Sequence, residues 1–273
     1  SPSSGIGRQL EAMADLEGSL RVGVLGLGAG TLAAYGREDD DLEGYLAYPM
    51  DVGAVLESKG VDSTKTSLPG VVVIHEWWGL NENVRTAARR LAGEGYRVLA
   101  VDLYGKAVAE TPDSARVLMQ QALENKDRLM ANLKSAYNYL EAEREAGRVG
   151  ILGWCFGGSM TFSALATMPT SFDAAVAYYG SPEALTTEAL QSMSTPVLAH
   201  FGRQDNAISM DQVRAFQDRL GGMEKNVRIH LYDAGHAFAN PSGQNYNPEA
   251  ARRAWTRTVN FLQMQLYPMP EEK

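Results

Sequence analysis

The most constraining feature of this sequence is a regular alternation between short apolar runs and longer segments with helical apolar spacing. The runs are rich in valine, isoleucine, leucine and tyrosine, which is typical of β-strands. The expected strands are Gly44–Tyr48, Val71–Ile74, Arg97–Val101, Val149–Gly153, Ala174–Tyr179, Val197–Phe201 and Val227–Tyr232. The expected helices are Glu82–Gly93, Asp113–Glu145, Gly158–Met168, Met210–Leu220 and Pro248–Leu266. This order predicts a mostly parallel central sheet with helices on both faces, and an antiparallel edge at Gly44–Tyr48.

Composition narrows the class of protein further. The chain has 273 residues, of which 45% are hydrophobic and 21% charged, as in ordinary globular proteins. A net charge of −8 argues against a nucleic-acid partner. No run approaches the ~20 apolar residues of a membrane span, and the first residues lack a signal-peptide pattern. One cysteine excludes an intrachain disulfide. We therefore expect a cytoplasmic protein without a membrane partner.

The turn after Val149–Gly153 reads G-W-C-F-G-G and leads directly into a helical pattern. This is the strand–turn–helix setting of a nucleophile elbow, with Cys155 where serine is usual. Gly153 and Gly157 leave room for so tight a turn. The backbone N–H of Phe156 is then aimed at a developing oxyanion. A buried structural cysteine is the alternative that this motif alone leaves open.

A base and an acid follow in later strand-end loops. His236 comes just after Val227–Tyr232, and Asp205 comes after Val197–Phe201. The chain order Cys155, Asp205, His236 is the order of nucleophile, acid and histidine in α/β-hydrolases. Asp233 is a rival acid, but it lies in the loop of His236 itself. Asp205 can alternatively serve only as a turn or cap residue. No metal-binding motif is found, and no metal is expected.

With these residues assembled, the chain resembles the dienelactone hydrolase family from about Leu42 to Leu266. The resemblance is carried by a set of motifs in order. They are L-E-G-Y-L-A-Y-P, V-V-V-I-H-E-W-W-G-L-N, V-D-L-Y-G-K, G-W-C-F-G-G, G-R-Q-D and A-G-H-A-F. It implies an α/β-hydrolase fold, no cofactor and hydrolysis of small carboxylic esters or lactones through an acyl-thioester on Cys155. It also implies that Glu76 assists thiol activation and that the backbone N–H of Trp77 is the second oxyanion donor.

Two positions depart from the family's dienelactone-cleaving members. Those members hold the substrate carboxylate with two arginines, and the matching positions here are Lys106 and Asn240. Lysine lacks the bidentate fork of arginine, and asparagine lacks the charge. Lys106 can partly replace the lost arginine or be an ordinary loop lysine. We therefore expect hydrolase chemistry with an altered specificity.

Aromatic and polar side chains concentrate in the strand-end loops, which suits an apolar site for a small ligand. The expected walls are Trp77, Trp78, Leu80, Asn81, Tyr104, Trp154, Phe156 and Phe238, together with Lys106 and Asn240. The expected partner is a small ester or lactone, and the expected assembly is a monomer or a small homo-oligomer.

The first residues read differently from the rest. A predicted strand at Arg21–Leu27 is followed by G-L-G-A-G, which resembles the glycine-rich turn of spermidine-synthase-like methyltransferases. The second strand that should follow is missing. We expect residues 1–41 to be a non-catalytic extension and residues 42–273 to form the α/β-hydrolase domain. Two alternatives stay open at this point: a ligand-binding homologue with weakened catalysis, and a methyltransferase fragment led by residues 21–36.

Overall fold

A computed structural model of the chain describes residues 31–34, 43–62, 67–142 and 147–267. Eight strands form one sheet in the order β1-β2-β4-β3-β5-β6-β7-β8. The strands are β1 (Thr31–Ala34), β2 (Gly44–Pro49), β3 (Gly70–Ile74), β4 (Arg97–Val101), β5 (Val149–Trp154), β6 (Ala174–Tyr178), β7 (Val197–Gly202) and β8 (Val227–Tyr232). From β4 to β8 all neighbours are parallel, whereas β1 and β2 add antiparallel pairs. The predicted mostly parallel sheet is confirmed.

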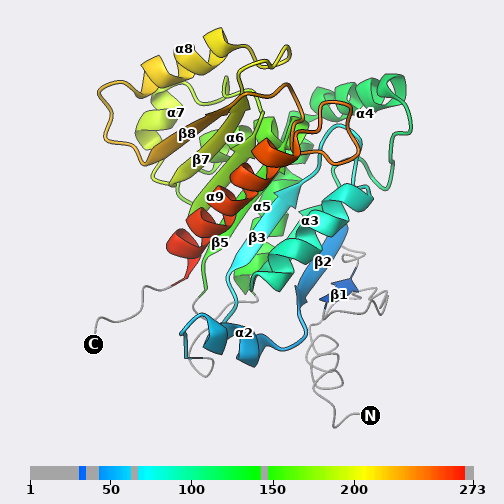
Figure 1. The fold of residues 1–273 in the computed structure, drawn as a ribbon, viewed down its shortest axis with the longest axis vertical. Helices are drawn as coiled ribbons and strands as arrows, with labels where there is room; N and C mark the ends of the chain where they lie inside the picture. Colours follow the sequence, from blue (N-terminus) through cyan, green and yellow to red (C-terminus); the bar gives the residue numbers. More distant parts are fainter. Residues whose placement is uncertain (1–30, 35–42, 63–66, 143–146, 268–273) are drawn as a thin grey trace.

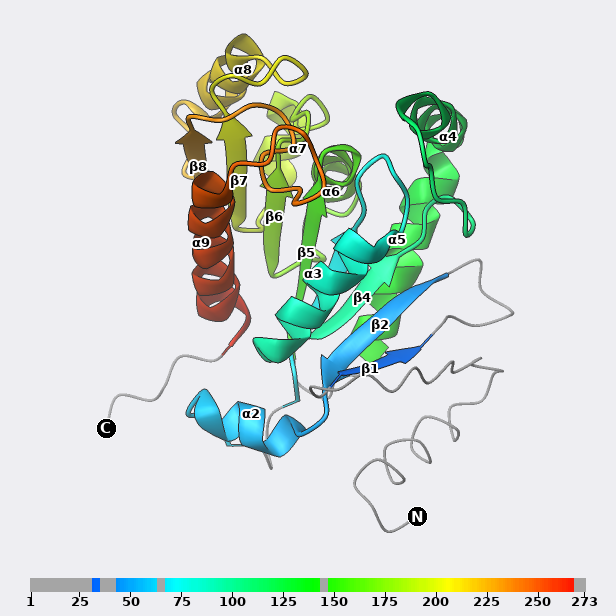
Figure 2. The same ribbon diagram turned by 45° about the vertical axis from the view of Figure 1, so that its right-hand side comes forward.

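Helices cover both faces of this sheet. Those of the described residues are α2 (Val52–Ser58), α3 (Glu82–Gly93), α4 (Pro112–Glu124), α5 (Lys126–Ala142), α6 (Phe156–Thr167), α7 (Thr187–Ser192), α8 (Met210–Leu220) and α9 (Pro248–Leu266). Figures 1 and 2 show α3 and α9 on one face and α5 and α6 on the other. Strands β3, β5, β6 and β7 are buried along their whole length, which explains their continuous apolar runs.

The helix expected over Asp113–Glu145 is wrong in one respect, because it is divided at Asn125. The N–H of Asn125 donates to Ala122 O at the end of α4, and its side-chain oxygen accepts from Arg128 N at the start of α5. Asparagine readily competes for backbone groups in this way. The apolar spacing continues through the break, so the sequence pattern did not indicate it. The short helices α2 and α7 were also not predicted.

The edge strand of the sheet is β1, whereas the sequence predicted the edge at Gly44–Tyr48 in β2. Strand β2 does pair antiparallel with β4, but β1 pairs with its other side, from Thr31↔Pro49 to Ala34↔Leu46. Part of the expected extension therefore belongs to the sheet. The predicted strand at Arg21–Leu27 and the glycine-rich turn up to residue 30 lie outside the described residues.

Parallel strands place their carboxyl ends at one edge of the sheet, where ligands bind in folds of this class. The loops that follow β3, β5, β6, β7 and β8 meet there. They carry Glu76, Cys155, Tyr179, Asp205 and His236 respectively.

Candidate functional site

Cys155 sits at the sharp turn between β5 and α6 with φ 54° and ψ −114°. A positive φ is strained for any residue with a side chain. The turn is held because the N–H of Cys155 donates to Tyr178 O at 2.9 Å, and Ser159 N donates to Cys155 O at 3.0 Å. A Cβ on Gly157 would lie 2.4 Å from Ile74 O, so only glycine lets α6 approach β3 this closely.

The thiol faces a histidine that is itself held by a buried carboxylate. His236 Nε2 lies 3.1 Å from Cys155 Sγ, and His236 Nδ1 lies 2.8 Å from Asp205 Oδ2. The other carboxylate oxygen of Asp205 accepts the N–H groups of Ala207 and Ile208 at 2.7 and 2.8 Å. Because the Asp205 carboxylate can only accept, Nδ1 carries a proton and Nε2 is directed at the sulfur.

The surroundings favour the charged form of His236. Burial alone lowers the pKa of this imidazole, but the hydrogen bonds and charges of Asp205 and Cys155 outweigh burial and raise the pKa to about 10. A proton that passes from sulfur to Nε2 is therefore held strongly by the ring.

The other acid and the other histidines have different partners. Asp233, the rival acid, is exposed and lies 3.4 Å from Arg203 Nε rather than against His236. His75 is buried, and its Nε2 accepts from Leu103 N at 3.2 Å, so its Nδ1 donates to Glu76 O at 2.6 Å. His200 lies on β7 and hydrogen-bonds the hydroxyls of two side chains from β8 and α9, namely Tyr232 and Thr258.

Glu76 follows β3 and is almost completely buried. Tyr179 Oη donates to Glu76 Oε1 at 3.2 Å, and the amide of Asn240 donates to Glu76 Oε2. Burial raises the pKa of Glu76 to about 7, and the two donors and His236 only partly oppose this rise. In this structure the carboxylate is engaged by Tyr179 and Asn240, and no hydrogen bond joins it to Cys155 among the described residues.

This raised pKa predicts a pH-dependent stability. Folded Glu76 keeps its proton up to about pH 7, whereas the unfolded side chain loses its proton near pH 4.5. The free energy of unfolding of the wild type should therefore fall as the pH rises from about 4.5 to about 7. Glu76→Gln mimics the protonated form. We expect its free energy of unfolding to gain up to about 3 kcal/mol relative to the wild type between about pH 5 and about pH 8.

Urea denaturation at several pH values measures this difference. Glu224→Gln, at an exposed carboxylate, is the matched control and should stay within about 0.5 kcal/mol of the wild type throughout. A flat difference for Glu76→Gln would mean that Glu76 ionises normally in the folded protein.

The proposed oxyanion donors lie on the two loops that flank the sulfur. Phe156 is the first residue of α6, where the N–H has no partner within the helix. Trp77 follows Glu76, and no backbone hydrogen bond of its N–H is found within the described ranges. Both N–H groups are therefore available to a ligand.

Several residues expected to bind substrate have partners within the protein. The Asn81 side chain caps α3 by accepting from Val84 N at 3.3 Å. Lys106 Nζ lies 2.8 Å from Glu43 Oε1, in an ion pair at the surface. Phe238 is fully buried against Tyr179 and Tyr232, which corrects its assignment to the pocket wall.

Other expected wall residues contact one another or belong to the core. Tyr104 contacts the rings of His75 and Phe156, at centroid distances of 4.6 and 5.6 Å. Trp77 and Trp78 contact each other edge to face and are half-buried. Leu80 is buried in the core.

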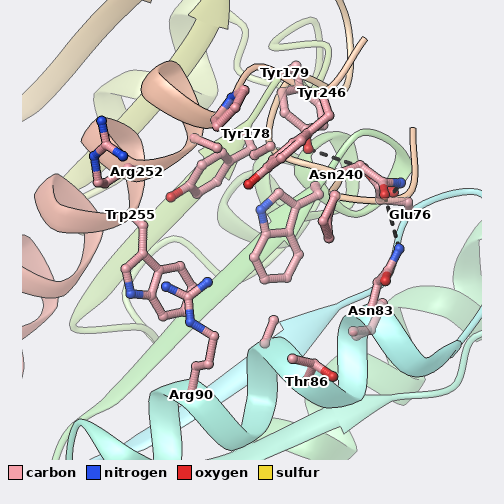
Figure 3. A pocket seen from close by; sticks show the side chains of 17 residues that line it. Glu76, Asn83, Thr86, Arg90, Tyr178, Tyr179, Asn240, Tyr246, Arg252 and Trp255 are labelled. Carbon is pink, nitrogen blue, oxygen red and sulfur yellow. Dashed lines mark hydrogen bonds between the residues drawn. The ribbon is translucent and has the colours of Figure 1, made fainter. Parts of the chain in front are cut away.

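A cavity of about 410 Å³ opens between α3 and α9, as Figure 3 shows. Of the expected site residues, Glu76, Trp154 and Asn240 line it, whereas Cys155 and His236 do not. Glu76 and Tyr179 lie at the boundary, because the Tyr179 ring also contacts His236 at a centroid distance of 5.2 Å. The cavity is thus a neighbour of the thiol and not its immediate surroundings.

Tyr179 is the main functional candidate that sequence reasoning missed. It has φ 38°, follows β6 at the edge that carries the other groups, and contacts both Glu76 and His236. The run A-Y-Y-G at a strand end was a usable signal, since the neighbouring strand ends had already indicated chemistry. Asn83, which donates to Asn240 Oδ1 at 3.0 Å, gave no such signal because it lies within a helix.

No group of three or more histidine, cysteine or acidic side chains that could hold a metal is found in the described part of the chain. None of the helices within those ranges combines the length and the apolar character needed to cross a membrane.

Comparison with known families decides the affiliation. The model of the dienelactone hydrolase family matches residues 56–266. The chain belongs to the dienelactone hydrolase family. Protein usf of Aquifex pyrophilus is 32% identical over 202 residues, which cover 71% of this chain and 87% of that protein. Carboxymethylenebutenolidase 1 of Cupriavidus pinatubonensis is 28% identical over 209 residues, covering 74% and 88%.

Solved structures agree with this assignment. A Klebsiella pneumoniae protein assigned as a dienelactone hydrolase is 25% identical, with a TM-score of 0.70, over 85% of this chain and 98% of that one. The fold is the α/β-hydrolase fold that the motifs predicted. As a member of the dienelactone hydrolase family, the protein is a hydrolase of the class that acts on carboxylic esters and lactones.

Proposed function

We propose that this dienelactone hydrolase-like enzyme cleaves small carboxylic esters or lactones by nucleophilic catalysis, with Cys155, His236 and Asp205 as its triad. One observation carries the proposal. Sulfur, imidazole and carboxylate form a continuous line, with 3.1 Å from Cys155 Sγ to His236 Nε2 and 2.8 Å from His236 Nδ1 to Asp205 Oδ2. This is the arrangement that an activated nucleophile requires.

The first half of the reaction forms a thioester. Cys155 gives its proton to His236, and the sulfur attacks the carbonyl carbon of the ester. The N–H groups of Trp77 and Phe156 stabilise the resulting oxyanion. When the intermediate collapses, the carbon–oxygen bond to the alcohol breaks, and His236 returns the proton to the departing oxygen.

The second half releases the acid. His236 removes a proton from a water molecule as the water attacks the thioester carbonyl. The carbon–sulfur bond then breaks, the carboxylic acid leaves, and the sulfur recovers the proton from His236. Asp205 holds the ring and stabilises its charged form throughout.

Glu76 is proposed to assist thiol activation from outside this line. Its pKa of about 7 allows it to accept or give a proton under ordinary conditions. Contact with the sulfur requires the carboxylate to leave Tyr179 and Asn240, so this assistance involves a side-chain movement.

The substrates we favour are small and uncharged around the scissile bond. Of the two positions that match the family's carboxylate-binding arginines, Lys106 is paired with Glu43 and Asn240 with Glu76. Neither offers a free cation to a substrate anion. The alternative of a binding homologue with weakened catalysis has only this altered clamp in its favour.

Trapping the acyl-enzyme tests the proposal. We expect intact-mass spectra of the protein, quenched in acid during turnover of p-nitrophenyl butyrate with reductant present, to reveal one butyryl adduct. Because the chain has one cysteine, peptide mapping should locate that adduct at Cys155 without ambiguity. An adduct on another residue, or turnover without any adduct at the shortest quench times, would contradict the thioester route.

A further inference from the structure

The cavity between α3 and α9 has walls that suit a flat apolar ligand. Aromatic rings from the sheet, the connecting loop and α9 line it, namely Trp154, Tyr178, Tyr246 and Trp255. Small aliphatic side chains such as Ala87 and Ala251 leave space between the two helices. A volume of about 410 Å³ lies within the range of small-molecule sites.

One end of this cavity is cationic. Figure 3 shows Arg90 and Arg252 on either side of Trp255. The Arg90 guanidinium carbon lies 4.0 Å from the Trp255 ring centroid, a cation–π contact that leaves the guanidinium N–H groups for another acceptor. Neither arginine makes an ion pair with an acidic side chain in the described ranges. In a chain with a net charge of −8, two unpaired cations at one cavity form a distinct anion-binding feature.

The opposite end of the cavity is polar, and its side chains are hydrogen-bonded to one another. Glu76 accepts from Tyr179 and Asn240, and Asn83 donates to Asn240 Oδ1 at 3.0 Å. Figure 3 shows this cluster on the far side of Tyr178 and Tyr246 from the two arginines. Both carboxyl oxygens of Glu76 are already hydrogen-bonded, and the described residues at this end include no cation, so the arginine end is the one that favours a ligand carboxylate.

We propose that this cavity binds a small aromatic carboxylate, with its ring among the tyrosines and tryptophans and its carboxylate at Arg90 and Arg252. The aromatic walls supply apolar burial and ring contacts, and the guanidinium groups supply charge-assisted hydrogen bonds. Both arginines are exposed at the rim, so the charge sets the selectivity for an acid, while the walls supply most of the affinity.

This site is distinct from the proposed triad. Cys155 and His236 do not line the cavity, and Glu76 with Tyr179 lies between them and its interior. Binding there and hydrolysis at Cys155 can therefore be tested separately. All titrations are best done with the Cys155→Ala protein, so that no acyl transfer contributes and the outcome does not depend on the catalytic proposal.

Isothermal titration with 2-naphthylacetate, its neutral amide, acetate and inorganic phosphate tests the assignment. We expect saturable binding of 2-naphthylacetate, with the amide at least about ten-fold weaker. The Arg90→Gln/Arg252→Gln double variant should bind the acid no better than the amide. Arg253→Gln is the matched control on the same helix, since Arg253 is paired with Glu249 and lies outside the cavity; it should bind like the parent.

Filling the cavity tests its location. Ala251→Phe should abolish binding of acid and amide alike, and Ala87→Leu provides a second filling variant from the other helix if Ala251→Phe does not fold. The proposal is overturned if 2-naphthylacetate does not bind, if acid and amide bind equally, or if the double arginine variant binds like its parent. It is also overturned if phosphate alone binds as tightly as the acid, or if a folded filling variant retains full affinity.

Discussion

Replacing Cys155 by alanine is expected to lower kcat/KM for p-nitrophenyl butyrate by at least about 10⁴-fold. Alanine removes the sulfur that we propose as the nucleophile, while Asp205, His236 and the backbone N–H donors remain. Loss of a nucleophile from a triad leaves only the residual rate that oxyanion stabilisation and substrate positioning provide. Initial rates at matched enzyme concentrations, with reductant present, measure the effect.

The matched control for this prediction is Ser163→Ala. Ser163 lies two turns further along α6, where its hydroxyl donates to Ser159 O at 3.1 Å, so its loss changes the same helix without touching the sulfur. We expect this variant to keep nearly all activity. If Cys155→Ala retained more than about a tenth of the wild-type rate, a different group would have to be the nucleophile.

A single methyl group at Gly157 should destabilise the fold by at least about 4 kcal/mol, an effect in the rare upper range for point substitutions. Its Cβ would lie 2.4 Å from Ile74 O and 2.6 Å from His75 O, and both are backbone atoms of the β3 end that cannot turn away. The residue is helical, so alanine is otherwise the better helix former by about 1 kcal/mol. The whole decrease in the free energy of unfolding would therefore come from the steric clash between α6 and the end of β3.

Gly93→Ala is the control for Gly157→Ala. Gly93 closes α3, and a Cβ there would meet nothing within 4 Å. Thermal and urea denaturation should find this variant as stable as the wild type or slightly more stable. A Gly157→Ala protein with an unchanged unfolding midpoint would mean that the elbow can relax, and the tight approach of α6 would not then be a requirement of the fold.

The strands could be predicted well because the sheet is buried on both sides. Continuous apolar runs such as Val71–Ile74 arise only where both faces are covered, and their ends were predicted to within a residue or two. The break between α4 and α5 at Asn125 could not be predicted, because apolar spacing does not indicate which backbone groups an asparagine side chain hydrogen-bonds. The proximity of Cys155, Asp205 and His236 could be predicted, because each follows a parallel strand and the three occur in the chain order of an α/β-hydrolase triad.

The cavity between α3 and α9 depends on packing between helices that are far apart in the sequence. Trp255 and Arg90 look like ordinary amphipathic helix residues in the sequence, and only the shared face of α3 and α9 brings them together. Phe238 was wrongly expected in the pocket wall for a related reason, whereas Asn81 caps α3 and its contact with substrate stays a prediction. An aromatic ring in a functional loop can turn into the core, and an asparagine before a helix is as readily a cap as a ligand contact.

Strand β1 changes where the domain should be considered to begin. The family's shared region starts at residue 56 and the recognisable motifs start near residue 42, yet β2 is paired on both sides only because Thr31–Ala34 lies against it. A strand with one free edge presents unpaired N–H and C=O groups that recruit strands from other chains. Thr31–Ala34 lies outside the residues that the family model matches, yet it pairs with the outer edge of β2 and becomes the terminal strand of the sheet. A protein that lacks these residues should therefore expose the N–H and C=O groups of β2, a strand that is buried along its whole length here.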